Sequence, residues 1–303
     1  MSRKKKGSRI DGVLLLNKGV GLSSNKALQQ VKILYGAMKA GHTGSLDPLA
    51  CGLLPICFGQ ATRLSSYLLD TNKRYRVRAQ LGVCTSTGDA EGAVISRKKV
   101  ANFSVSQIET VLNEFMGEIL QIPPMYSALK QNGKRLYELA RQGIEVERKA
   151  RSVTIHELDL LKVDSDVLEL DVLCSKGTYI RTLLEDIGNA LECGAFVQEL
   201  IRTEVGSFQL RNAWNIDQLQ SMASNSDREK CLLPPDAVVR AWPKLQFSDQ
   251  SVYCARQGQV VSTELVPMQG WVRMYTNDQK FFGIGEVIEN NKIAPRKLFS
   301  GLD

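Results

Sequence analysis

Between Lys73 and Leu81 the side chains alternate strictly between two kinds, and this segment constrains the fold more than any other part of the chain. One face carries Tyr75, Val77, Ala79 and Leu81, and the other carries Arg74, Arg76, Arg78 and Gln80. A period of two residues predicts a β-strand with one apolar and one polar face. The fold must therefore contain a sheet that covers a core with one of its faces.

Other segments predict helices and strands interleaved with that strand. Strands are predicted at Val13–Leu16, Leu53–Phe58 and Val197–Phe208, and an antiparallel pair at Ser152–Val163 and Val167–Cys174 around Asp164-Ser165-Asp166. Helices are predicted after Ser23 or Ser24, over Ala61–Leu69, from Ser104 to Gly117 with Gln107 in a capping box, and from Gly177 to near Gly194. Interleaved helices and hairpins favour an α+β fold over a βαβ array.

A chain of 303 residues suits one large domain and a smaller one. Residues 1–9 are predicted to form a basic flexible tail, and residues 10–245 the large domain. The stretch 211–245 contains a polar patch and several prolines, which indicates the junction. Short strands separated by turns in residues 246–303 predict a small β-barrel-like module.

The net charge of +7 is concentrated at the N-terminus. Residues 1–9 supply five of the seven charges, so residues 10–303 carry only +2, and RNA bound to the folded body would have to use local patches. One candidate patch is a predicted helix between Gly133 and Gly143, with the cations Lys130, Lys134, Arg135 and Arg141, followed by Arg148, Lys149 and Arg151. Such a run also fits an ordinary solvated face.

The cysteines and histidines argue against disulfides and metal sites. Seven cysteines are scattered without a C-x-x-C pair, which indicates reduced thiols and a cytoplasmic protein. The two histidines, His42 and His156, have no ligand spacing, so no metal is expected. No apolar run is long enough for a signal segment or a membrane span, and no glycine-rich cofactor motif is present.

The segment from Gly41 to Ala50 places Asp47 on a turn bounded by glycine and proline, between apolar residues. A carboxylate in such surroundings is expected to be shielded from water and to need a cationic partner to stay ionised. A protein can present a carboxylate nucleophile in this way. Asp-Pro is also an ordinary turn dipeptide, so these residues alone leave both interpretations open.

Several separated motifs, in a fixed order, resemble the bacterial TruB family of tRNA pseudouridine synthases over nearly the whole chain. The matching segments are Asp11–Lys18, Ala40–Ala50 (AGHTGSLDPLA), Lys73–Tyr75, Ile122–Lys130 (IPPMYSALK) and Cys174–Thr182 (CSKGTYIRT). The resemblance implies an α+β catalytic domain with a central mixed, largely antiparallel sheet and a C-terminal PUA-like RNA-binding module. It further implies isomerisation of uridine 55 in the TψC arm of tRNA to pseudouridine, without a cofactor, by a protein expected to be monomeric.

Carried over by position, Asp47 would be the catalytic aspartate and Arg181 the arginine that keeps it ionised. Tyr75 would stack on the target base and take part in proton transfer from C5. Tyr179 and Leu200 would line the uridine pocket. Without the resemblance, Arg181 would be an exposed helix residue, and Tyr75 and Leu200 would be core residues of strands.

The resemblance makes His42 a further substrate-binding residue and gives Asp89, Lys18 and Arg202 a supporting role. His42 would fill the space left by the flipped uridine, since an enzyme must offset the cost of unstacking a base. Asp89 falls in a segment that folds over RNA in the family, although an exposed hairpin loop explains the same residues. Lys18 and Arg202 match positions near the site.

A second hypothesis remains from another functional class. The same domains could grip and remodel tRNA as a noncatalytic RNA-folding protein. The combination of Asp47, Tyr75 and Arg181 favours catalysis, because binding alone has no need of a buried carboxylate.

Overall fold

The computed structural model describes residues 7–131, 133–263, 267, 269–299 and 301. Its main element is a nine-stranded sheet with the order β1-β3-β12-β4-β11-β10-β7, to which β2 and β13 are attached at β3 and β12. Its strands are β1 Gly12–Lys18, β2 Ala40–His42, β3 Cys51–Phe58, β4 Lys73–Leu81, β7 Gly117–Gln121, β10 Arg151–Asp164, β11 Val167–Cys174, β12 Ala195–Val205 and β13 Phe208–Gln209. Every pairing is antiparallel except β12 with β3, so the sheet is mixed and largely antiparallel, as expected.

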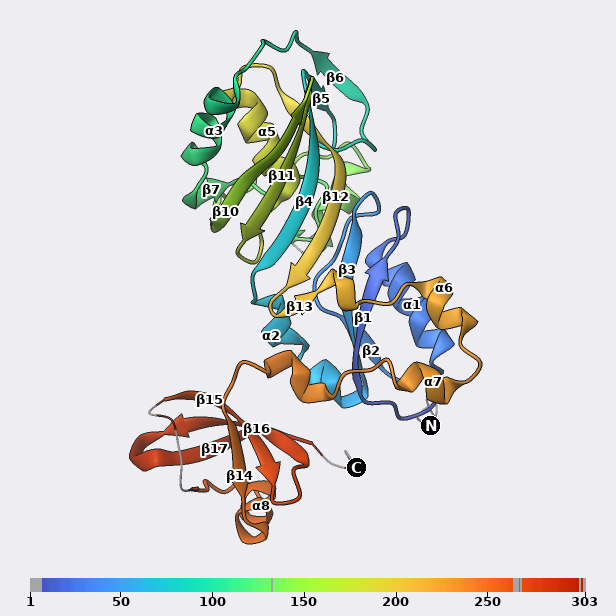
Figure 1. Ribbon diagram of the computed structural model, residues 1–303, viewed down its shortest axis with the longest axis vertical. Helices are drawn as coiled ribbons and strands as arrows, with labels where there is room; N and C mark the ends of the chain where they lie inside the picture. Colours follow the sequence, from blue (N-terminus) through green and yellow to red (C-terminus); the bar gives the residue numbers. More distant parts are fainter. Residues whose placement is uncertain (1–6, 132, 264–266, 268, 300, 302–303) are drawn as a thin grey trace.

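Helices pack on this sheet along its length (Figure 1). The α-helices are α1 Ser24–Leu34, α2 Ser65–Leu69, α3 Val105–Glu114, α4 Leu136–Ala140, α5 Ile180–Ala190, α6 Ile216–Ser221, α7 Asn225–Glu229 and α8 Asp249–Arg256. Short 3-10 helices are η1 Gly59–Arg63, η2 Leu210–Asn212, η3 Pro235–Val239 and η4 Glu289–Asn291. In the described part of the chain, none of the helices has the length and hydropathy needed to span a membrane.

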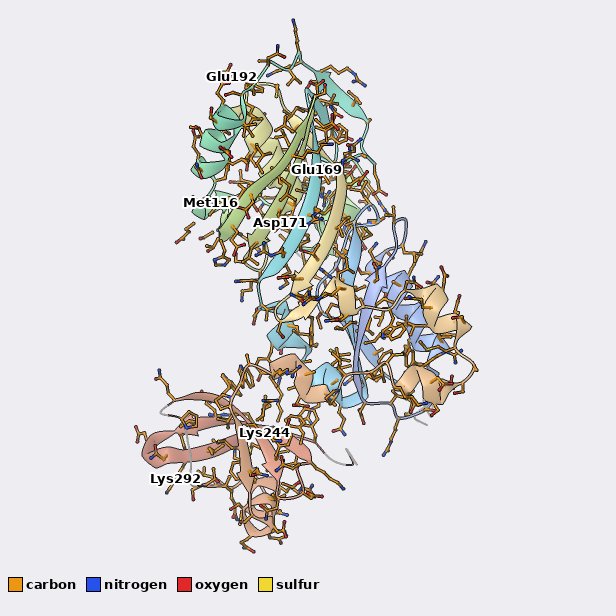
Figure 2. The ribbon with its side chains drawn as sticks, viewed as in Figure 1. Met116, Glu169, Asp171, Glu192, Lys244 and Lys292 are labelled. Atoms are coloured by element: carbon orange, nitrogen blue, oxygen red, sulfur yellow. The ribbon has the colours of Figure 1, made fainter. Side chains whose placement is uncertain are left out.

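The alternation in β4 has the predicted effect. Val77, Ala79 and Leu81 are buried in the main core together with residues of α3 and α5. On the opposite face, Arg74 pairs with Glu157, Asp171 and Glu204, and Arg78 pairs with Glu169 and Glu199. Figure 2 shows Glu169 and Asp171 along β11 on this face. Acids therefore offset these two arginines across the strands.

The predicted hairpin of β10 and β11 is confirmed, and Ser165 adopts a left-handed φ of 55° at its turn. The predicted helices α1, α3 and α5 are also present, and Ser23 and Ser104 cap the first two. Gly117 lies just beyond α3 and begins β7. Two small two-stranded sheets, β5 Val83–Thr85 with β6 Val94–Arg97 and β8 Lys130–Gln131 with β9 Lys134–Arg135, complete this part.

One local expectation was wrong. Ala61–Leu69 is not one helix but the 3-10 helix η1 followed by α2, because the backbone around Leu64 forms i→i+3 hydrogen bonds. The side chains of Ala61 and Leu64 are buried in an apolar cluster. The predicted helix between Gly133 and Gly143 is present as α4, whereas Lys130, Lys134 and Arg135 lie before it in the β8–β9 hairpin, where Gly133 takes a φ of +81°.

The last residues of the predicted tail contact the body of the protein. Ser8 exchanges backbone hydrogen bonds with Gly36 and Met38, so residues 7–9 are exposed but attached. The basic residues Arg3, Lys4, Lys5 and Lys6 lie outside the described residues.

A second sheet, with the order β14-β15-β16-β17, lies at the C-terminal end (Figure 1). Its strands are β14 Lys244–Phe247, β15 Gly270–Thr276, β16 Phe281–Ile288 and β17 Lys292–Leu298. Together with α8 this sheet encloses a core of its own. A further apolar cluster contains residues of both sheets, among them Val13 and Leu53 from one and Tyr275, Phe281 and Ile284 from the other.

Candidate active site

The loop between β2 and β3 carries Asp47 into a pocket with a volume of about 430 Å³. Five segments that are far apart in the sequence line this pocket: residues 44–50, α2 with β4, residues 127–129, residues 175–181 and β12. Of the residues that the sequence singled out, the pocket brings together Asp47, Tyr75, Tyr179, Arg181, Leu200 and Arg202.

Arg181 holds the Asp47 carboxylate at the pocket wall. One guanidinium nitrogen lies 3.0 Å from Asp47 Oδ2, and the other lies 3.3 Å from Asp89 Oδ2. The guanidinium also donates to the carbonyl oxygens of Thr87 (3.0 Å) and Tyr126 (2.8 Å). Arg181 is only 6% exposed, so it is not the exposed helix residue that the sequence alone would suggest.

The Asp47 side chain is less shielded than expected, because 44% of its surface is open to the pocket. Protein atoms on the other sides still displace water, and this burial raises the pKa of Asp47. The Arg181 charge lowers that pKa, whereas the Asp89 charge raises it, and the balance stays above the ordinary aspartate value. The carboxylate is therefore accessible to a molecule in the pocket and paired with a cation that cannot lose its proton.

Asp89 lies behind Arg181 and does not line the pocket. It is buried, its carboxylate accepts hydrogen bonds from the Thr87 hydroxyl and the Glu91 backbone N–H (3.1 Å), and its backbone bridges to Val197. The exposed hairpin loop considered from the sequence is thus wrong at this residue. A buried acid that is paired with Arg181 fixes the direction of the guanidinium.

Arg202 braces the Asp47 loop from β12. Its side chain is fully buried and donates to the carbonyl oxygens of Leu53 (2.7 Å), Ser45 (3.3 Å) and Gly44 (3.2 Å). Each of these contacts is a charge-assisted hydrogen bond to a backbone that would otherwise be free to move. The sequence placed Arg202 near the site, and the structure gives it this geometric role.

Lys18 is also fully buried, and its ammonium donates to the carbonyl oxygens of Gly19 (2.9 Å) and Leu22 (2.7 Å). Burial lowers the pKa of Lys18 to about 8. Its positive charge lowers the pKa of Asp47, so it acts on the carboxylate from outside the pocket lining.

The two tyrosines and Leu200 form much of the remaining wall. Tyr75 lies opposite Arg202 across β4 and β12. Burial raises the pKa of Tyr75 and the Arg202 charge offsets only part of that rise, so the phenol is neutral at pH 7. Tyr179 is held through its backbone by the Gln121 amide, which accepts from its N–H (3.0 Å) and donates to its carbonyl oxygen (3.3 Å).

Like Asp89 and Lys18, His42 is a predicted residue that does not line the pocket. It is half-buried on β2 and does not line the cavity. Burial lowers the pKa of His42, and its Nδ1 forms no hydrogen bond with any residue that the structure describes.

Sequence reasoning gave no role to Lys73 and Leu69, which line the pocket beside Asp47. The Lys73 ammonium is buried and donates to the carbonyl oxygens of Leu68 (3.2 Å) and Leu69 (2.7 Å) at the end of α2. A lysine at the start of a strand is ordinarily exposed, so the pattern of residues carried no signal for this contact. The described residues include no cluster of three or more His, Cys, Asp or Glu side chains that could hold a metal ion.

Models of known protein families match nearly the whole chain. Residues 32–180 match the family model described as TruB family pseudouridylate synthase (N terminal domain). Residues 181–240 match the tRNA pseudouridylate synthase B C-terminal domain, and residues 243–299 match Pseudouridine synthase II TruB, C-terminal.

Curated relatives match at high identity over almost their full length. The tRNA pseudouridine synthase B of Nitrosococcus oceani is 50% identical over 98% of this chain and 97% of its own. Those of Ectopseudomonas mendocina and Stutzerimonas stutzeri are each 51% identical, over 96% and 95% of this chain and 95% of their own.

Solved structures with the same fold include the one titled Crystal Structure of a Cbf5-Nop10-Gar1 Complex. It has a TM-score of 0.72 and 25% identity, and the match covers 95% of this chain and 84% of that chain. The family models, the identity to curated relatives and the shared fold lead to one conclusion: the chain belongs to the TruB family of pseudouridylate synthases.

Proposed function

We propose that this chain converts uridine 55 in the TψC arm of tRNA to pseudouridine, with Asp47 as the nucleophile. The Arg181–Asp47 contact of 3.0 Å in a pocket beside two tyrosines is the observation that carries this proposal. The curated relatives, at about half identity over nearly the full chain, are named for this activity on tRNA.

The reaction exchanges one bond to the sugar for another. The bond between C1′ of the ribose and N1 of uracil breaks, the base turns within the pocket, and C5 of uracil bonds to C1′. The proton on C5 leaves and N1 gains a proton, so no oxidant or reductant is consumed.

The carboxylate of Asp47 suits this sequence because it adds to the sugar or the pyrimidine ring and leaves again. Arg181 keeps it anionic, and Arg202 holds the loop that carries it. Tyr75 has its phenol protonated and lies on the pocket wall, where it would stack on the base and take part in the transfer of the C5 proton.

A base that is stacked within an RNA helix cannot bring its glycosidic bond to Asp47, so in this proposal the uridine leaves its stack to enter the pocket. In this proposal Tyr179 and Leu200 pack on the flipped nucleoside, and His42, which lies outside the pocket lining, takes the space that the base leaves. Basic side chains of the β8–β9 hairpin and residues 246–303, taken as a PUA-like RNA-binding module, would hold the arm.

We further place this activity in the cytoplasm, with one chain acting on one tRNA. The seven cysteines are free thiols, as in a reducing compartment.

The test is to incubate the purified chain with an unmodified tRNA transcript and to map pseudouridine chemically. We expect product at position 55 with the wild type. Asp47→Asn should form none and keep tRNA affinity within about tenfold, because only the nucleophile is lost.

Turnover by Asp47→Asn would overturn the role of Asp47. Tight binding by a wild-type chain that forms no product would instead favour the noncatalytic RNA-folding hypothesis.

A further inference from the structure

An ion pair spans the rim of the pocket. Lys176 Nζ lies 2.7 Å from Asp70 Oδ1, and the two side chains are 61% and 62% exposed. Asp70 follows α2, directly after the pocket residue Leu69, and Lys176 lies between the pocket residues Ser175 and Gly177. The pair therefore joins two separate segments of the pocket wall.

The pair contributes little to holding these segments together. Exposed ion pairs between flexible side chains are worth about 0.2–1 kcal/mol, and other contacts already fix both segments. Lys73 holds the end of α2 through the carbonyl oxygens of Leu68 and Leu69, and Gln121 holds the backbone of Tyr179. Breaking the Asp70–Lys176 pair would leave both rims in place.

Position and charge make the Lys176 ammonium a ligand for an anion that enters with the substrate. A flipped nucleotide carries a phosphodiester on each side, and these groups must lie near the rim when the base is in the pocket. The cations that line the pocket itself already have partners, because Lys73, Arg181 and Arg202 donate to carbonyl or carboxylate oxygens. Lys176, at the rim, is exposed instead, and its partner Asp70 is equally exposed.

We propose that Lys176 binds a phosphodiester of the RNA strand next to the target uridine, in exchange for its ion pair with Asp70. Asp70 is then a competitor that occupies the phosphate site in the free protein. The proposal rests on the function proposed above, since it requires an RNA strand at the pocket.

This exchange predicts opposite effects for the two partners. Asp70→Asn removes the competitor and should tighten tRNA binding by up to about fivefold, the equivalent of one exposed ion pair. Lys176→Gln removes the phosphate ligand and should weaken binding. It should also lower the slope of log K against log salt by about 0.7, the value for one single-strand phosphate contact.

The experiment measures tRNA affinity by fluorescence anisotropy over a series of salt concentrations, in an Asp47→Asn background so that turnover does not interfere. The double variant Asp70→Asn/Lys176→Gln should bind like Lys176→Gln alone, because the gain from losing Asp70 requires Lys176. The matched control is Asp164→Asn, which releases Lys162 from an ion pair of 3.0 Å whose members are 58% and 61% exposed, at the β10–β11 turn. That variant should not change affinity.

A gain from Asp70→Asn that persists without Lys176 would mean general charge repulsion and would overturn the exchange. Equal affinity of the Asp47→Asn parent and its Asp70→Asn derivative would overturn it as well. Wild-type protein with Asp47 intact is assayed in parallel for pseudouridine, so that failure of the proposed function is distinguished from failure of the exchange.

Discussion

At the scale of single residues, the charges around Asp47 set the pH at which it can react. Burial raises its pKa, Arg181 lowers it and Asp89 raises it. In the proposed mechanism the reactive form is the carboxylate, so kcat/KM should fall as the pH drops through this raised pKa. The acid limb should therefore lie above the range of an ordinary aspartate.

Two substitutions should move this limb in opposite directions. Arg181→Met removes the charge that favours the anion, so the limb should shift to higher pH. Asp89→Asn removes a neighbouring negative charge, so it should shift to lower pH. The measurement is kcat/KM against pH for the three proteins. A limb that stays in place in both variants would show that a group other than Asp47 controls it.

Through its resemblance the sequence predicted these three residues and the pairing of Arg181 with Asp47, but it did not predict that Asp89 pairs with the same guanidinium. Asp47, Asp89 and Arg181 lie on separate segments, and local patterns do not report distances between segments. The exposed-loop interpretation of Asp89 failed because burial of an acid depends on a guanidinium from α5, more than 90 positions away in the chain.

At the scale of elements, the parallel pairing of β3 with β12 fixes the Asp47 loop. Gly52 pairs with Arg202 in this ladder and has a φ of +100°. A Cβ at Gly52 would lie 2.4 Å from the Arg202 carbonyl oxygen, far inside van der Waals contact. No residue other than glycine fits at this position of the β3–β12 pairing without moving β12.

Gly52→Ala should therefore destabilise the fold by at least about 2 kcal/mol and reduce activity, because it strains the backbone and displaces Arg202. Gly41→Ala is the control, since its Cβ would meet no atom within 4 Å. Urea unfolding of both variants measures the difference. Equal stability of the two would contradict the close packing of β3 against β12.

Local sequence patterns predicted some of these elements but not the contact between β3 and β12. The alternation of β4 and the capping box of α3 depend on neighbouring residues, and both were confirmed. The parallel contact of β3 and β12 joins strands about 150 residues apart, so no local pattern contains it.

At the scale of the whole molecule, aromatic residues join the C-terminal sheet to the body. Trp271 of β15 stacks on Trp242 with ring centroids 5.3 Å apart, and both meet the edge of Tyr67 from α2. Because α2 also carries Leu69 into the pocket, the C-terminal sheet and the pocket share one supporting element.

Trp271→Ala should loosen this junction and weaken tRNA binding more than the chemical step, because the pocket residues keep their own contacts. Single-turnover rates at saturating protein and tRNA affinity are measured together. Tyr253→Ala on α8 is the control, since Tyr253 is exposed in the same part of the chain. A collapse of the single-turnover rate in Trp271→Ala would contradict this separation.

A point substitution is the better test because deletion of residues 246–303 would damage the body. Phe281 and Phe299 share an apolar cluster with Val13 and Leu53 of the main sheet. Their removal would expose that cluster to water.

By itself, the sequence determined the α+β class and most of the elements and, through its resemblance, pointed to Asp47 as the candidate nucleophile and to Arg181 as its partner. These features follow from the spacing of apolar residues, from helix-capping residues and from the order of the motifs, all of which are properties of the sequence itself. Only the tertiary structure decided that Lys18, Lys73 and Arg202 are buried and that Asp70 meets Lys176 at the rim. The physical reason is that a charged side chain is buried only where carbonyl or carboxylate oxygens from other segments solvate it, and folding alone brings those segments together.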